Sequence, residues 1–323
     1  MVTVAIEPGI TKLSITSSLL GMKNYWDHFL ASWAVNREGH RVVPGLYALG
    51  NPSPDSPVFV TANYTLSFDA LRSTLKDIDG FILVLDTKGV NVWCAAGKGT
   101  FGTEELVKRI EATHLQEVVN HRNLILPQLG APGVSGFEVT KRTHFKVEYG
   151  PVRADDLPEY LKTRSATLEM RRVKFTTLDR LTLIPVELVA VLLPLIILLL
   201  IGSKGLVAAI LAGTVLFPIL LPWIPTHNFS TKGFILGAAV AVPFAIVAFL
   251  KDPASALWLR ISWAMVNALL IPPITAYLAL NFTGSTTFTS RTGVRNEMFA
   301  YIPTMAWMFG AGLLLNIGIF FVH

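Results

Sequence analysis

The sequence predicts a Rossmann-like α/β domain followed by an all-α domain of five transmembrane helices. Two observations predict this order. Short apolar, strand-like runs alternate with helical patterns as far as residue 162, and this alternation is typical of a mostly parallel sheet covered by helices. From residue 184 onward the chain has only six Lys/Arg and three Asp/Glu, whereas residues 1–160 contain 15 basic and 17 acidic residues. A long charge-poor segment of this kind is typical of membrane spans.

The elements of the first domain follow from its apolar runs. We expect strands at 58–62, 81–86, 123–126 and 145–149, and helices at 23–29, 68–76, 103–121 and 155–162. In open α/β sheets, ligands bind outside the carboxyl ends of the strands. Four strand ends, at residues 61–64, 87–89, 128–133 and 150–154, are therefore candidates for the rim of one site. The cofactor contacts expected among them are Thr61, Asn63, Tyr64, Gly150, Pro151 and Ala154. Each of them, taken alone, also suits an ordinary turn.

The second domain is predicted from five apolar segments. They cover residues 181–201, 206–223, 233–250, 257–280 and 298–322. Each is long enough, or nearly so, to cross about 30 Å of hydrocarbon at ~1.5 Å per residue. Buried core helices are the alternative, and five such runs separated by short loops disfavour it. The sequence thus predicts a domain at 1–165, a basic linker at 166–182 and a transmembrane domain at 183–323.

The net charge of +5 is concentrated next to the first apolar segment. Six basic residues cluster there: Lys162, Arg164, Arg171, Arg172, Lys174 and Arg180. This placement suits anionic lipid headgroups, and we expect no nucleic-acid partner. The Lys/Arg bias predicts a multi-pass protein of the cytoplasmic membrane, with the first domain in the cytoplasm and the C-terminus outside. The first 20 residues lack the pattern of a signal peptide.

Cys94 is the only cysteine of the chain and follows a strand-like run and a short turn. A lone cysteine is most often a small buried hydrophobic residue without a chemical role. Its neighbours favour a different role. Lys98, one helical turn away, would stabilise the thiolate, and Gly97 and Gly99 would let a flat ligand approach the backbone. These residues indicate either a soft metal ligand or a nucleophile.

Residues 91–98 read Asn-Val-Trp-Cys-Ala-Ala-Gly-Lys. This stretch resembles the cap-helix motif of the mercury-methylating corrinoid proteins (HgcA family), with no departure at any of its eight positions. The resemblance extends to residues 44–47, 60–64, 126–133 and 149–154, and it covers essentially the whole chain, including the C-terminal membrane domain. The first domain also resembles, more distantly, the corrinoid-binding domain of the corrinoid iron–sulfur protein of the acetyl-CoA pathway.

The resemblance implies a cofactor and its site. The first domain would be a Rossmann-like corrinoid-binding domain that holds a cobalamin-type corrinoid. Cys94 would be the catalytic residue and the lower axial ligand to the corrinoid cobalt. The cofactor-binding residues would be Asn91, Val92, Trp93, Cys94, Ala95, Gly97 and Lys98, together with Thr61, Asn63, Tyr64, Gly150, Pro151 and Ala154. With one cysteine, the chain is expected to hold no iron–sulfur cluster of its own.

The resemblance also implies an activity: a membrane-anchored corrinoid methyltransferase that transfers a methyl group from methyl-cobalt(III) to Hg(II). The implied partners are the membrane, a small ferredoxin with two [4Fe–4S] clusters as electron donor and Hg(II) relay, and a methyl donor of methyl-folate type. The alternative is a corrinoid methyl carrier of one-carbon metabolism with a different acceptor, which needs no thiolate ligand. A transporter or receptor with a nucleotide-binding domain is disfavoured, because the chain has no Walker-type phosphate loop.

Overall fold

A computed structural model describes residues 13–36, 39–286 and 291–322 of the chain. The chain divides into two compact units, Met1–Val173 and Lys174–His323, which are called the α/β unit and the helical unit below. A mixed α/β sheet domain followed by a helical region is thus confirmed. The finer division predicted from the sequence, at 1–165, 166–182 and 183–323, stays a prediction.

A six-stranded sheet forms the centre of the α/β unit, with the strand order β1-β2-β4-β3-β5-β6. The strands are β1 Ser14–Thr16, β2 Gly45–Leu49, β3 Val58–Ala62, β4 Gly80–Leu85, β5 Asn123–Leu126 and β6 Lys146–Tyr149. Strands β4, β3, β5 and β6 are parallel to one another, whereas β2 pairs with β4 in the antiparallel direction. The four predicted strands are present, and the sequence analysis missed β1 and β2.

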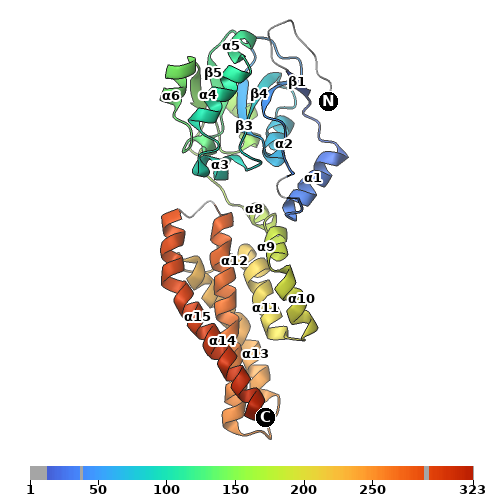
Figure 1. Ribbon diagram of the computed structural model, residues 1–323, viewed down its shortest axis with the longest axis vertical. Coiled ribbons are helices and arrows are strands. Elements are labelled where there is room, and N and C mark those ends of the chain that lie inside the picture. The colour runs from blue at the N-terminus through green and yellow to red at the C-terminus, as the bar shows by residue number, and fades with distance from the viewer. Residues whose placement is uncertain (1–12, 37–38, 287–290, 323) are drawn as a thin grey trace. The chain divides into compact units, whose positions relative to one another are not determined.

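Helices cover both faces of this sheet (Figure 1). One face packs against α2 (Thr65–Thr74) and α7 (Leu157–Thr163), and the other against α4 (Thr103–Ala112), α5 (Leu115–Val118) and α6 (Gly136–Thr143). Successive side chains of a strand point to opposite faces. Every residue of β3 and β4 is therefore buried. This two-sided burial explains the continuous apolar runs in the sequence.

The long helix predicted at 103–121 is two helices in the structure, because a turn separates α4 from α5. At the turn, the Thr113 hydroxyl donates a hydrogen bond of 2.8 Å to the Arg109 carbonyl. His114 then takes a left-handed conformation with φ +48°. The apolar spacing continues through this turn, with Ile110 and Leu115 both buried. Periodicity alone consequently could not locate the break.

The helical unit contains three helices that are long and apolar enough to cross a membrane, judged over the described residues by length and composition: Phe229–Leu250 (α13), Leu257–Ser285 and Thr292–Val322. The last two consist largely of α14 (Leu257–Phe282) and α15 (Arg291–Val322). The remaining elements are α8 Thr177–Leu181, α9 Ile184–Ala190, α10 Leu192–Leu200, α11 Lys204–Leu211, the π-helical turn η3 Ala212–Leu216 and α12 Phe217–Leu220. The prediction of five spanning helices is therefore wrong.

The first two predicted spans fail for identifiable reasons. The apolar segment 181–201 is broken, because the helical stretches 177–190 and 192–200 meet at an angle of 64°. Pro194 lies just after the break, and a proline ring clashes with the carbonyl four residues earlier, here that of Ala190. Counted as one span, this bent pair would raise the number to four. The second segment is a shorter apolar helix, Lys204–Leu220.

Helices α13 and α14 approach each other closely because glycines stand at their contact. A Cβ atom on Gly233 would lie 2.5 Å from the Cα atom of Ala276, and one on Gly237 would lie 2.6 Å from the Cα atom of Pro272. Real Cβ atoms do not approach backbone atoms this closely. No larger residue therefore fits at either position unless the two helices separate.

Candidate functional site

The carboxyl ends of β3 and β4 are joined by the side chain of Asn63. This side chain is only 3% exposed. Its Oδ1 atom accepts hydrogen bonds from the backbone N–H groups of Thr87 at 3.0 Å and Gly89 at 2.9 Å. Its Nδ2 atom donates to Oδ1 of Asp86 at 3.2 Å. A single buried amide thus holds the loop that leads from β4 to the cysteine.

The same loop turns sharply at two residues with left-handed backbones. Lys88 has φ +59° and Gly89 has φ +73°. The carboxylate of Asp86 accepts the Lys88 N–H at 3.0 Å and so stabilises the turn. The left-handed φ favours glycine at position 89, and a Cβ atom there would lie 2.7 Å from Nε of Arg41, whose side chain would have to shift. The turn fixes where the next helix begins.

That helix, α3 (Val92–Lys98), is short and is capped at both ends by residues of the motif. At its start, Oδ1 of Asn91 accepts the backbone N–H of Cys94 at 2.9 Å, as an N-cap residue does. At its end, Gly99 is left-handed with φ +81°, and its N–H bonds to the last carbonyls of the helix. Residues 91–99 therefore specify both ends of α3 by themselves.

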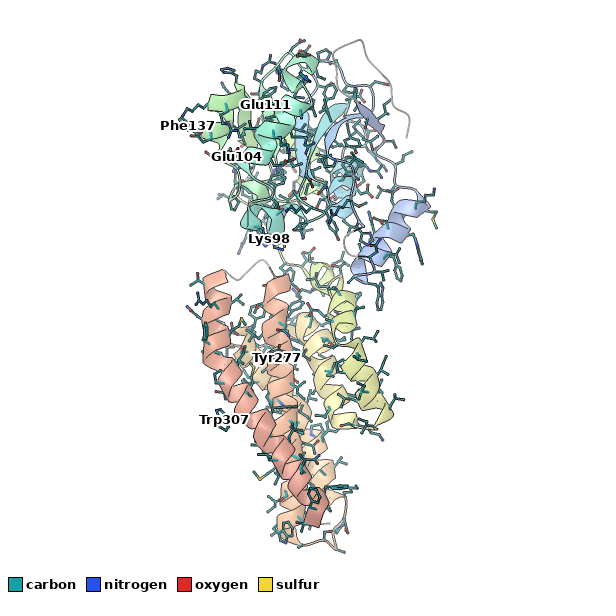
Figure 2. The ribbon with its side chains drawn as sticks, in the orientation of Figure 1. Lys98, Glu104, Glu111, Phe137, Tyr277 and Trp307 are labelled. Carbon is teal, nitrogen blue, oxygen red and sulfur yellow. The ribbon has the colours of Figure 1, made fainter. Side chains whose placement is uncertain are left out.

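The two faces of α3 differ in burial. Val92, Ala95 and Ala96 are buried in the core of the α/β unit. Trp93 and Cys94 are half-buried, whereas Gly97 and Lys98 are exposed. Figure 2 labels Lys98 at the periphery of this unit. A Cβ atom on Gly97 would meet no heavy atom within 4 Å. The outer face of α3 thus presents the thiol beside open space at Gly97.

A loop after β5 supports α3 from the side. A Cβ atom on Gly133 would lie 3.0 Å from the Cα atom of Ala96 and 2.1 Å from the carbonyl oxygen of Phe101. The Thr103 N–H donates to the Gly133 carbonyl at 3.2 Å. Phe101 itself is fully buried. The sequence analysis did not single out Phe101. The signal that could have identified Phe101 is the position of a large aromatic residue just after the glycine-containing stretch 97–99.

The other predicted site residues lie at the same edge of the sheet but are less accessible. Thr61 is 3% exposed within β3, and Tyr64 precedes α2 as its N-cap residue. Gly150 and Pro151 are buried and tie two loops together. The Gly150 N–H donates to the Leu126 carbonyl at 2.8 Å, and the Pro151 carbonyl accepts the Gln128 N–H at 3.3 Å. Ala154 begins the short helix η2 (Ala154–Asp156). Ligand contacts at these positions stay predictions.

The donor set around Cys94 restricts the kind of metal that could bind there. Within the described part of the chain, no group of three or more His, Cys, Asp or Glu residues could hold a metal ion. A metal at Cys94 would therefore have to bring most of its own ligands, as the metal of a macrocycle does. The half-exposed thiol and the open surface at Gly97 fit a flat macrocycle of this kind.

Comparison with known proteins relates the α/β unit to one group of proteins. Residues 34–160 match the family described as CO dehydrogenase/acetyl-CoA synthase delta subunit. A relative named acetyl-CoA decarbonylase/synthase complex subunit gamma, from Methanopyrus kandleri, is 38% identical over 128 residues, which make up 39% of this chain and 27% of the relative. The subunit of the same name from Archaeoglobus fulgidus is 36% identical over 124 residues, 38% of this chain and 26% of the relative.

These matches correct the family resemblance. The similarity found is to subunits of the acetyl-CoA decarbonylase/synthase complex and not to mercury-methylating proteins. It agrees with the more distant resemblance, which was to a protein of the acetyl-CoA pathway. The assignment to the mercury-methylating family is wrong, and Hg(II), the small ferredoxin with two [4Fe–4S] clusters and the methyl-folate-type donor are no longer implied as partners. The aligned part covers about a quarter of the length of these relatives.

The predicted location is corrected by the same finding. The sequence predicted a multi-pass protein of the cytoplasmic membrane, with the membrane as a partner and the C-terminus outside. The relatives are named as subunits of the acetyl-CoA decarbonylase/synthase complex, and the long helices qualify as spans by length and composition alone. The helical unit lies outside the family match at residues 34–160. The comparisons therefore identify relatives of the α/β unit alone, and these relatives are named as subunits of an acetyl-CoA decarbonylase/synthase complex.

Proposed function

We propose that the α/β unit binds a corrinoid at the carboxyl edge of its sheet and that the chain is a corrinoid methyl carrier of one-carbon metabolism. The observation that carries the cofactor site in this proposal is the half-exposed thiol of Cys94 beside the open space at Gly97. The similarity to acetyl-CoA decarbonylase/synthase subunits supports the metabolic setting. The corrinoid would supply the cobalt on which a methyl group can travel between a donor and an acceptor.

The residues of α3 would have different tasks in holding the cofactor. Cys94 would be the lower axial ligand, and the Asn91 cap would keep its backbone in place through the 2.9 Å hydrogen bond. Gly97 would leave room for the flat ring, whereas Trp93 and Lys98 would border it. Val92 and Ala95 anchor the helix in the core. Because a thiolate is a charged donor, it would make the metal electron-rich, as axial ligands do in haem proteins.

The partners follow from the relatives rather than from this chain. We propose that they are other subunits of an acetyl-CoA decarbonylase/synthase-type complex, since the relatives are named as gamma subunits of such a complex. Co-purification of the full chain with subunits of that complex, from cells that contain both, tests this. Recovery of the chain without any of them, under conditions that preserve the complex itself, contradicts it.

The cofactor proposal is tested by the visible spectrum of the purified chain mixed with a cobalt(III) corrinoid. We expect a spectrum that differs from that of the free corrinoid and that includes a thiolate-to-cobalt charge-transfer feature. Retention of the corrinoid through gel filtration checks that it is bound. If no corrinoid is retained, the proposed function is wrong. If corrinoid is retained with no thiolate feature, the carrier function stands and the role of Cys94 is wrong.

Replacing Gly97 by leucine should prevent ligation of the corrinoid cobalt by Cys94 without disturbing the fold. The Cβ position at Gly97 is open, so the side chain meets no protein atom there, but it would occupy the surface on which the ring is proposed to rest. Metal–ligand distances tolerate only about 0.2 Å. We therefore expect Gly97→Leu to lose the thiolate feature and Gly97→Ala to weaken it less, in the same spectral assay.

The matched control for this substitution is Ala112→Leu, which places the same leucine side chain at an exposed residue of α4. It should leave both the spectrum and the retained corrinoid unchanged. A normal spectrum in Gly97→Leu would show that the cofactor approaches Cys94 from another direction.

A further inference from the structure

A cavity of about 280 Å³ lies within the helical unit, where four helices meet. Its polar lining comes from four places in the chain: Ser203 just before α11, Lys251 at the end of α13, Asn267 in α14 and Asn316 in α15. All four helices are otherwise strongly apolar. Ser203 and Asn267 are half-buried, whereas Lys251 and Asn316 are exposed, so the cavity is open on one side. Polar groups that converge beside an apolar wall are typical of a small-molecule binding site.

Asn267 is held so that part of its amide stays available. Its Nδ2 atom donates a hydrogen bond of 3.1 Å to the Trp263 carbonyl, one turn earlier in α14. A Cβ atom on Gly205 would lie only 2.9 Å from Oδ1 of Asn267. Glycine at position 205 therefore makes room for the amide. The second amide hydrogen of Asn267 and the amide of Asn316 are donors that a ligand could use.

Lys251 supplies a positive charge at the cavity. Among the described residues, none forms an ion pair with its ammonium group. The adjacent Asp252 is engaged within the loop, where its carboxylate accepts the Ala254 N–H at 3.1 Å and the Ser255 hydroxyl at 2.7 Å. The loop is thereby ordered, and it places the lysine at the cavity.

The remaining wall of the cavity is apolar. Leu206, Val266 and Leu270 line it, and Leu270 is only 4% exposed. A ligand that matches this lining carries one negative charge with hydrogen-bond acceptors at one end and a short hydrocarbon body at the other. A monocarboxylate has this arrangement, and the volume suits a chain of a few carbon atoms.

We propose that this cavity is a binding site for a small aliphatic monocarboxylate. The carboxylate would lie between the ammonium group of Lys251 and the amides of Asn267 and Asn316, with the hydrocarbon chain against Leu206 and Leu270. The site is separate from the proposed corrinoid site, since it is built only from residues of the helical unit. Either proposal can therefore fail without the other.

Isothermal titration of the purified full chain with hexanoate tests the proposal, with 1-hexanol as a neutral ligand of the same length. We expect saturable binding of hexanoate and at least about tenfold weaker binding of hexanol, because a charged acceptor forms stronger hydrogen bonds than a neutral one. Lys251→Gln should weaken hexanoate binding about tenfold. The control Lys204→Gln changes an exposed lysine of α11 that does not line the cavity, and should leave it unchanged.

Asn316→Leu provides a second test, because this exposed residue can be replaced with little risk to the fold. It should weaken hexanoate binding and leave hexanol binding unchanged or stronger. The proposal is overturned if hexanoate does not bind saturably. It is also overturned if hexanol binds equally well, or if Lys251→Gln and Lys204→Gln have the same effect.

Discussion

Replacing Cys94 by alanine is expected to abolish thiolate ligation of the corrinoid and to weaken corrinoid binding by about 100-fold or more. Loss of an outer-shell partner alone costs about 10–100-fold in metal affinity, and Cys94 is proposed as a direct ligand. The thiol is half-exposed, and the helix around it is held by its caps and by Ala95 and Ala96. The fold should therefore survive. Titration of a cobalt(III) corrinoid, followed by its visible spectrum, measures both effects.

Cys94→Ser is the matched control for size. Its hydroxyl has nearly the volume of the thiol but remains protonated at neutral pH, so it should also lack the charge-transfer feature. Far-ultraviolet circular dichroism of both variants should equal that of the unaltered chain. An unaltered affinity and spectrum in Cys94→Ala would remove the axial-ligand role and leave the thiol a structural one.

Replacing Asn63 by alanine is expected to destabilise the α/β unit by about 3 kcal/mol. The substitution leaves the N–H groups of Thr87 and Gly89 without their acceptor, and each unsatisfied buried group costs about 1–3 kcal/mol. Because the same loop positions α3, corrinoid binding should weaken as well. Urea denaturation, followed over the transition of the α/β unit, measures the loss of stability.

The control for this substitution is Asn120→Ala. Asn120 is exposed and donates one hydrogen bond of 3.0 Å to Asp55, so its loss should cost less than about 1 kcal/mol. Asn63→Asp should not rescue the loop. Aspartate keeps the acceptor for the two N–H groups, but it replaces the Nδ2 donor with a second oxygen facing Asp86. Equal stability of Asn63→Ala and Asn120→Ala would show that the amide does not hold the loop.

The parallel core of the α/β unit could be predicted from the sequence because its strands are buried on both faces. Apolar runs such as those of β3 and β4 leave few alternatives to a central parallel strand. The strand β2 was missed even though four of its five residues are also buried. It follows residues with no regular pattern, and its antiparallel pairing with β4 depends on a partner more than 30 residues away. Sequence periodicity does not report such a pairing.

The residues around Cys94 could be predicted, whereas the acceptor of the methyl group could not. Asn91 and Gly99 cap α3, and Ala95 and Ala96 pack it on the core. A short helix needs such caps and such packing residues to hold one thiol in a fixed position. They do not describe the molecule that receives the methyl group. A motif of this kind therefore specifies the helix that carries the thiol, and the wider match over residues 34–160 points to a different metabolic setting.

The close contact of α13 and α14 has a consequence for how the helical unit can move. Gly233 lies against Ala276 and Gly237 against Pro272, with the two backbones too close to admit a Cβ atom, so we expect these tightly packed helices to move as one body. The break between α9 and α10 is different, because Val191 between them has a non-helical ψ of +10° and Pro194 has no N–H to donate. Any bending within this unit should be concentrated at that hinge, and a cross-link across it would suppress the motion while one between α13 and α14 would change nothing.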